Sequence, residues 1–172
     1  IIEGRSDEEH IEAIVRFTSN LAKNASDDLD TMRVGGTEEE IIARGSDWCT
    51  DVARVGCALC QVAGLAARIV YLFDTEKAYS GHAIIEVYRA KAWGAVDPLT
   101  NVIYRHTGGR PASTWDLMND HLLIKRHRRG TSTPYTLAEQ FREAGITNYL
   151  VWRWWEYDYT ISEINDYYRF IL

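Results

Sequence analysis

Cys49, His82 and Asp97 are the residues whose types and order suit nucleophilic catalysis. In such chemistry a thiolate attacks a carbonyl, an imidazole moves the proton, and a carboxylate holds the imidazole in one tautomer. Each residue has a fitting local sequence, since Cys49 opens an apolar segment, His82 begins an alternating run and Asp97 ends the next short apolar run. None of the three is specific alone, but their joint placement predicts a thiol catalyst.

The nucleophile would have to lie at the start of a helix. Residues 49–64 are apolar on nearly all sides, which predicts a helix in the centre of a domain. Unpaired N–H groups and the macrodipole at a helix N-terminus lower the pKa of a thiol there. The segment from Gly45 to Trp48 predicts a flexible turn with capping oxygens. Asp51 is expected to raise the pKa of Cys49, so a nearby imidazolium must outweigh it.

The base and the acid would lie on a β-hairpin, and its loop length decides whether they meet. With a two- or four-residue loop between Tyr88 and Trp93, His82 lies one diagonal step from Asp97 on the same sheet face. A three-residue loop shifts the register by one and places the two side chains on opposite faces. The structural alternative stays open on spacing alone, with Cys49 in the core, His82 at a strand end and Asp97 in a turn before Pro98.

The other predicted elements indicate an α+β fold, with helices first, then antiparallel strands, then mixed elements. Predicted strands cover residues 67–73, 82–88, 93–97, 101–105 and 149–159. Pairs typical of a helix start occur at Ser6 and Glu9, Thr37 and Glu40, Ser113 and Asp116, Thr136 and Glu139, and Thr160 and Glu163.

Size and composition favour one globular domain over residues 1–172. The chain has a net charge of −6, with 46% hydrophobic and 26% charged residues, which argues against a general affinity for nucleic acid or anionic membrane. No apolar run approaches the roughly 20 residues that cross a bilayer. Three cysteines cannot form a full disulfide framework, so a reducing compartment such as the cytoplasm is favoured. Residues 1–5 are either natural sequence or a protease-cleavage linker.

The motifs around the three residues resemble the transglutaminase-like superfamily. Residues 45–54 match its cysteine motif, and residues 64–70 match the segment that leads into its first strand. Residues 81–88 and 93–98 match its histidine and aspartate motifs. The resemblance covers roughly residues 37–105 and leaves residues 106–172 without an assigned role. It implies a papain-like α+β core in which the nucleophile helix packs on an antiparallel sheet.

The resemblance implies acyl transfer on amide bonds of a peptide or protein, with Cys49 as nucleophile, His82 as general base and then acid, and Asp97 as orienting group. The backbone N–H of Cys49 is a natural oxyanion donor, and Trp48 is the candidate for a side-chain donor. No cofactor or metal is implied, and no calcium loop is recognisable. The alternative is a non-catalytic binding or scaffold module with the same fold. Substrate identity, oligomeric state and the choice between hydrolysis and transamidation stay open.

Three further patterns have a functional and a structural interpretation. Cys57 and Cys60 have redox spacing but lie inside the apolar helix, which favours core packing. The basic run 125–129 could bind an anionic partner such as nucleic acid, although a solvated surface is typical of such a run. Trp152 and Trp154, on one face of the predicted C-terminal strand, could line a substrate-binding wall or pack in the core.

Overall fold

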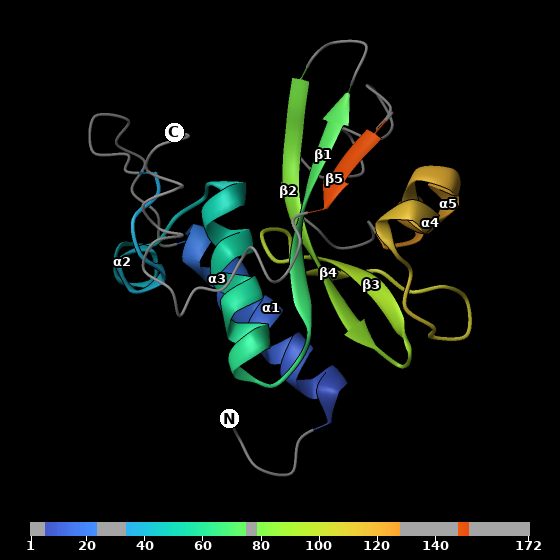
Figure 1. The fold of residues 1–172 in the computed structure, drawn as a ribbon, viewed down its shortest axis with the longest axis horizontal. Coiled ribbons are helices and arrows are strands. Elements are labelled where there is room, and N and C mark those ends of the chain that lie inside the picture. Colours follow the sequence, from blue (N-terminus) through green and yellow to red (C-terminus); the bar gives the residue numbers. More distant parts are fainter. Residues whose placement is uncertain (1–5, 24–33, 75–78, 128–147, 152–172) are drawn as a thin grey trace.

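The computed structural model describes residues 6–23, 34–74, 79–127 and 148–151 (Figure 1). The described helices are α1 (Asp7–Lys23), α2 (Glu38–Arg44), α3 (Cys49–Val62), α4 (Thr114–Asn119) and α5 (His121–His127). The described strands are β1 (Ala67–Asp74), β2 (Tyr79–Arg89), β3 (Ala92–Asp97), β4 (Val102–Ile103) and β5 (Asn148–Val151). None of the helices among the described residues is long and apolar enough to span a membrane.

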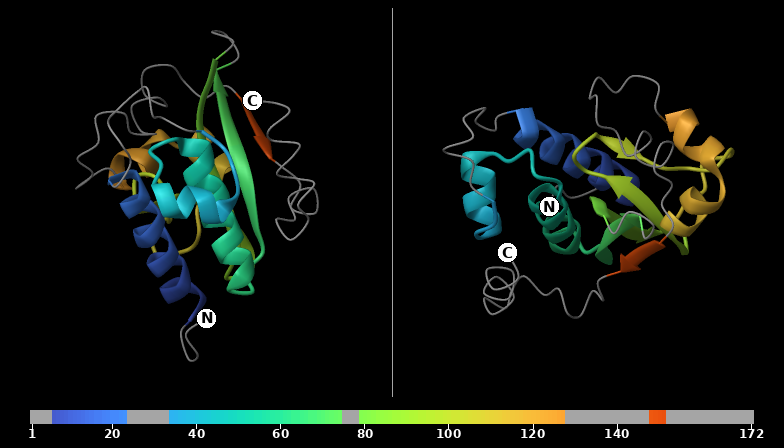
Figure 2. Two further views of the ribbon diagram at one scale, coloured as in Figure 1. Left: turned by 90° about the vertical axis from the view of Figure 1, so that its left-hand side faces the viewer. Right: turned by 90° about the horizontal axis from the view of Figure 1, so that it is seen from above.

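The strands form one antiparallel sheet with the order β4-β3-β2-β1-β5. Helices α1, α2 and α3 lie on one side of this sheet, and α4 and α5 lie on the other (Figures 1 and 2). The observed class is α+β with the cysteine-bearing helix α3 packed on β1 and β2, as the sequence predicts.

Alternation along the strands divides the core between the two faces of the sheet. On one face, Ala83, Ile85 and Val87 of β2 pack with side chains of α1 and α3. On the other face, Ile84 belongs to a cluster with Leu117 of α4 and Leu123 of α5. Burying each of the isoleucine, valine and leucine side chains contributes about 1.5–3 kcal/mol to folding, so both helical layers are held to the sheet by apolar contact.

The hairpin between β2 and β3 closes through a two-residue loop. Tyr88 pairs with Trp93 and Arg89 with Ala92, so the even register predicted from the sequence is confirmed. Ala90 and Lys91 have φ values of 48° and 63°, the left-handed conformation that a tight hairpin turn of this length requires. This register fixes which side chains of β2 and β3 share a face.

Three predicted capping boxes are observed at the starts of α1, α2 and α4. The Ser6 backbone N–H donates to Glu9, and Glu9 N–H donates back to Ser6 Oγ. Thr37 with Glu40 and Ser113 with Asp116 form the same reciprocal arrangement. The helices predicted from Thr136 and Thr160 lie outside the described residues, as does most of the predicted strand 149–159.

Candidate active site

His82 and Asp97 are in direct contact on neighbouring strands. His82 Nε2 lies 3.1 Å from Asp97 Oδ2, and the two side chains are only 5% and 0% exposed. The other carboxylate oxygen, Oδ1, accepts from the backbone N–H groups of Leu99 and Thr100 at 3.1 and 3.2 Å. Asp97 is therefore fixed at both oxygens, and its bond to Nε2 leaves Nδ1 of the imidazole for another partner.

The end of β3 that carries Asp97 is anchored by the helices. The carbonyl oxygen of Pro98 accepts from Thr18 Oγ1 of α1 at 3.2 Å. Gly56 of α3 faces the Pro98 ring, and a Cβ at Gly56 would come within 3.3 Å of the Pro98 Cβ. Glycine at this position thus allows α3 to approach the strand end closely.

Cys49 is the first residue of α3, as the sequence predicts, and it is half-buried rather than sealed in the core. Burial raises the pKa of Cys49, but hydrogen bonds and charge from His82, with smaller contributions from the Ala83 backbone and the Thr50 side chain, lower it below its ordinary value of 9.0 overall. The structure therefore brings Cys49, His82 and Asp97 together.

The imidazole in this group is held in its charged form. Burial lowers the pKa of His82, yet the charge and hydrogen bond of Asp97, assisted by Cys49, raise it from 6.5 to about 10. Burial likewise raises the pKa of Asp97, but His82 and the hydrogen bonds at Thr100 lower it below 3.8. A lowered thiol pKa and a raised imidazole pKa, in two groups that are in contact, favour a thiolate beside an imidazolium.

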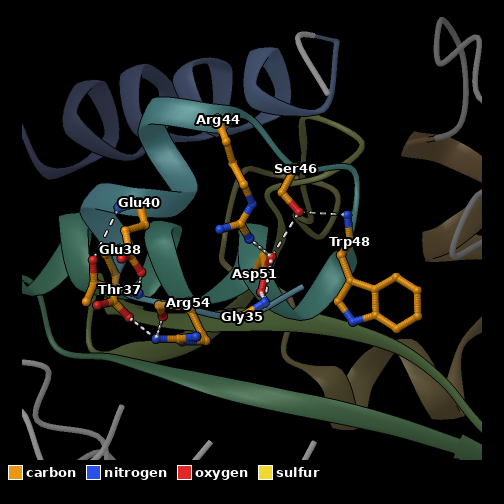
Figure 3. Close-up of polar contacts among 10 residues, drawn as sticks. Gly35, Thr37, Glu38, Glu40, Arg44, Ser46, Trp48, Asp51 and Arg54 are labelled. Carbon is orange, nitrogen blue, oxygen red and sulfur yellow. Dashed lines mark hydrogen bonds and ion pairs between the residues drawn. The ribbon is translucent and has the colours of Figure 1, made fainter. Parts of the chain in front are cut away.

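The start of α3 differs from the sequence prediction in how it is capped. Trp48 is the N-cap and makes no side-chain hydrogen bond to the first turn. In the segment that was expected to supply capping oxygens, Ser46 Oγ accepts from the backbone N–H of Trp48 at 3.2 Å (Figure 3). The Trp48 side chain is 42% exposed and points away from the Ser46–Asp51 contacts, and its role as an oxyanion donor stays a prediction.

Asp51 is a buried, ion-paired carboxylate rather than a free charge beside the thiol. Its carboxylate is 1% exposed and forms an ion pair with Arg44 at 2.6 Å. Burial raises the pKa of Asp51, while the Gly35 N–H, Ser46 and Arg44 oppose that rise. Arg44 thus compensates the charge of this carboxylate, and His82 lowers the pKa of Cys49 overall, so the imidazole outweighs the expected effect of Asp51.

Cys57 and Cys60 are core residues, as predicted. Both side chains are fully buried, and all three cysteines of the chain are free thiols. Burial raises the pKa of Cys57 well above its ordinary value and that of Cys60 to about 12. Of the three thiols, only Cys49 has a lowered pKa and lies at a helix start outside the buried core.

Glu86 is a buried acid that the sequence analysis missed. It accepts from Arg68 on β1 at 2.6 Å and from the Thr114 backbone N–H at the start of α4 at 2.7 Å. An open cavity of about 300 Å³ lies beside it, lined among others by Arg68, Trp93, Arg110 and Trp115. The signal was present, because Glu86 shares strand parity with the buried Ile84.

The remaining predicted site residues lie where the structure does not describe them. Trp152 and Trp154 are outside the described residues, and so are positions 128 and 129 of the basic run. Within the described part of the chain, no group of three or more His, Cys, Asp or Glu side chains is arranged to hold a metal ion.

Comparison with known families places most of the described core in one family model. The family model described as "Transglutaminase-like superfamily" matches residues 1–98, a span that contains Cys49, His82 and Asp97. Comparison with curated proteins gave no match, and comparison with solved structures gave none either.

Proposed function

The chain belongs to the transglutaminase-like superfamily, and from that premise we propose that it is an enzyme of thiol-dependent acyl transfer acting on amide bonds of a peptide or protein. The observation that carries the proposal is the contact series from Cys49 to His82 to Asp97. Family membership alone leaves activity open, whereas a lowered thiol pKa supported by a buried imidazole and carboxylate is what nucleophilic catalysis requires.

In the proposed first step, the Cys49 thiolate attacks the amide carbonyl carbon and forms a carbon–sulfur bond. The oxygen of the tetrahedral intermediate accepts from the backbone N–H of Cys49, at a helix start that no side chain caps. Collapse breaks the carbon–nitrogen bond, and the His82 imidazolium gives its proton to the departing amine. The product is a thioester on Cys49 and a neutral His82.

In the second step, water or a primary amine attacks the thioester carbonyl, and His82 now acts as the base. The carbon–sulfur bond breaks and Cys49 leaves as the thiolate, with the proton on His82. Water gives a carboxylic acid and an amine gives a new amide, so the acceptor decides between hydrolysis and transamidation. Asp97 takes no proton in either step, because its role is to hold the ring and stabilise the imidazolium.

The first test compares the three thiols within one molecule. Iodoacetamide at pH 6 should alkylate Cys49 much faster than Cys57 or Cys60, as measured by mass spectrometry of the digested protein. His82→Ala should slow the Cys49 reaction, and Cys49→Ala should remove it. Equal and slow alkylation of all three thiols in the folded protein would refute the proposal and favour a non-catalytic binding module.

The second test looks for the covalent intermediate. The protein is incubated with a peptide library, quenched in acid and digested, and the peptide that contains Cys49 is examined for an added acyl mass. We expect the adduct on Cys49 in the wild-type protein and none in Cys49→Ala. Adding hydroxylamine before the quench should remove the adduct, because a thioester is cleaved by this amine and an ordinary amide is not.

A further inference from the structure

The carboxylate of Asp51 accepts hydrogen bonds from several parts of the chain that surround the start of α3. Both oxygens accept from the Gly35 N–H at 3.1 and 3.2 Å. Oδ2 also accepts from Arg44 Nη2 at 2.6 Å and from Ser46 Oγ at 3.0 Å (Figure 3). One buried side chain therefore joins the segment before α2, the last turn of α2 and the loop that follows it to α3.

Ser46 extends these contacts to the residue that precedes Cys49. Its Oγ donates to Asp51 and accepts from the Trp48 backbone N–H at 3.2 Å. Its own backbone N–H donates to the Leu21 carbonyl of α1 at 3.3 Å. Because Ser46 is only 5% exposed, water does not compete well for these bonds. The loop into Cys49 is thereby fastened to α1 and to the first turn of α3.

Asp51 and Cys49 point in different directions from the same helical turn. Residues two apart on an α-helix lie about 200° apart around the axis and do not face each other. Cys49 accordingly contacts His82 and the Ala83 backbone, whereas Asp51 contacts Gly35, Arg44 and Ser46. The arrangement fixes one side of the turn by hydrogen bonds and presents the other side to the sheet.

We propose that Asp51 is a positioning residue that holds the start of α3 so that Cys49 stays in contact with His82. This inference rests on the proposed function, because it assigns Asp51 a role in the reactivity of that same thiol. Asp51 itself touches no reacting atom. It acts through Ser46 and the Trp48 backbone, and its negative charge is compensated by Arg44.

A positioning role and a purely electrostatic role of Asp51 predict opposite effects of Asp51→Asn on the rate of Cys49 alkylation. If Asp51 acted only as a negative charge two residues from the thiol, Asp51→Asn would lower the pKa of Cys49 and speed its alkylation. If Asp51 holds the helix start, Asp51→Asn removes the ion pair with Arg44, loosens the turn and slows alkylation. Asp47→Asn is the matched control, because Asp47 is an exposed acid two residues on the other side of Cys49.

The experiment measures the rate of Cys49 alkylation by iodoacetamide between pH 5 and 9, with folding checked by circular dichroism. We expect Asp51→Asn to slow the reaction at pH 6 by at least about tenfold, because each unit rise in the pKa of a thiol removes tenfold of its thiolate. The rising limb of the pH profile should move upward by about one pH unit. Asp47→Asn should leave the profile within about twofold of wild type. A rate in folded Asp51→Asn equal to or above wild type would overturn the proposal.

Substitutions at Ser46 keep the test decisive if Asp51→Asn does not fold. Ser46→Ala removes the hydroxyl between Asp51 and Trp48 and should slow alkylation in the same direction. Ser46→Thr keeps a hydroxyl and should restore the rate toward wild type. A folded Ser46→Ala protein with a wild-type pH profile would contradict the proposed route through this hydroxyl.

Amide hydrogen exchange separates failure of this inference from failure of the proposed function. If wild-type Cys49 reacts no faster than Cys57, the proposed function fails, but exchange still reports on positioning. We expect the Trp48 amide to exchange at least about tenfold faster in Asp51→Asn or Ser46→Ala than in Asp47→Asn. Unchanged exchange at Trp48 in both folded variants would overturn the positioning role whatever the thiol does.

Discussion

Replacing Asp97 by asparagine should abolish most of the reactivity of Cys49 while leaving the fold in place. Asparagine keeps the shape of the side chain and an oxygen that can accept from Leu99 and Thr100, as Oδ1 of Asp97 does. It loses the negative charge that lies 3.1 Å from His82 Nε2. The substitution thus isolates the electrostatic support of the imidazolium from the packing of the strand end.

The size of the effect follows from the competition between thiol and imidazole for one proton. The pKa of His82 is about 10 and that of Cys49 lies below 9.0, so the thiolate–imidazolium pair is favoured by more than about tenfold. With ordinary values of 6.5 and 9.0, the neutral pair would be favoured by about 300-fold. A thiolate whose thiol has a higher pKa is a stronger nucleophile, so part of the alkylation rate lost with the smaller thiolate fraction is recovered. We expect Cys49 alkylation at pH 6 to fall about 100-fold.

The assay is competitive alkylation with iodoacetamide at a series of pH values, with Cys57 and Cys60 as internal references in the same digest. Asp120→Asn, which removes an exposed acid far along the chain, is the control for a change of net charge. The rising limb of the profile should move toward the ordinary thiol range near pH 9 in Asp97→Asn. A folded Asp97→Asn protein that keeps more than a third of the wild-type rate at pH 6 would refute the reasoning.

Three further outcomes are expected. Lys91→Gly should stabilise the protein by about 1 kcal/mol, because Lys91 has a φ of 63° that glycine adopts without strain. Thermal unfolding should show this as a rise of about 2–4 °C in Tm. Lys91→Ala, which keeps a Cβ, should give no such rise. Glu86→Ala should lower the free energy of unfolding by about 3–5 kcal/mol, since it leaves the partner Arg68 and the start of α4 uncompensated; denaturant titration measures this, and a loss below 1 kcal/mol would contradict the role of Glu86. The free energy of unfolding that wild type gains over Asp97→Asn should be greatest between about pH 4 and 6.5. The raised pKa of His82 stabilises the fold below pH 6.5, and this contribution is lost as the pH rises toward about 10; the lowered pKa of Asp97 stabilises it above pH 3.8, and that contribution is lost below. A gain that grows from pH 7 to 10 would have the wrong sign.

Local patterns predicted the elements well because their signals are contained in a few neighbouring residues. The reciprocal pairs at Ser6, Thr37 and Ser113 each involve a hydroxyl and an acid three residues apart, and all three are observed. The start of α3 at Cys49 followed from a continuous apolar segment. The length of the hairpin loop was left open, because Ala90 and Lys91 are not the glycine or asparagine residues that usually mark a two-residue turn.

The parts of the site that sequence did not predict depend on contacts between distant segments. Helical geometry alone indicates that Asp51 faces away from Cys49. Its hydrogen-bond partners, however, are Gly35, which precedes α2, and Arg44 in the last turn of α2, and only the tertiary packing of this segment brings them to Asp51. The anchoring of Pro98 by Thr18 joins residues 80 positions apart, and no local pattern encodes it. The sequence patterns therefore predicted that Cys49, His82 and Asp97 would lie together, and they missed most of the contacts that hold these side chains in place.

The thiol and the imidazole come from different layers of the molecule, one from the helical layer and one from the sheet (Figure 1). A state in which these layers separate slightly would keep its helices and strands, yet Cys49 would revert to the behaviour of an ordinary cysteine. The alkylation rate of Cys49 should therefore report how closely the helices pack against the sheet. In a urea titration we expect it to decline before the circular dichroism signal does, and a simultaneous loss of both would mean that docking and secondary structure melt as one unit.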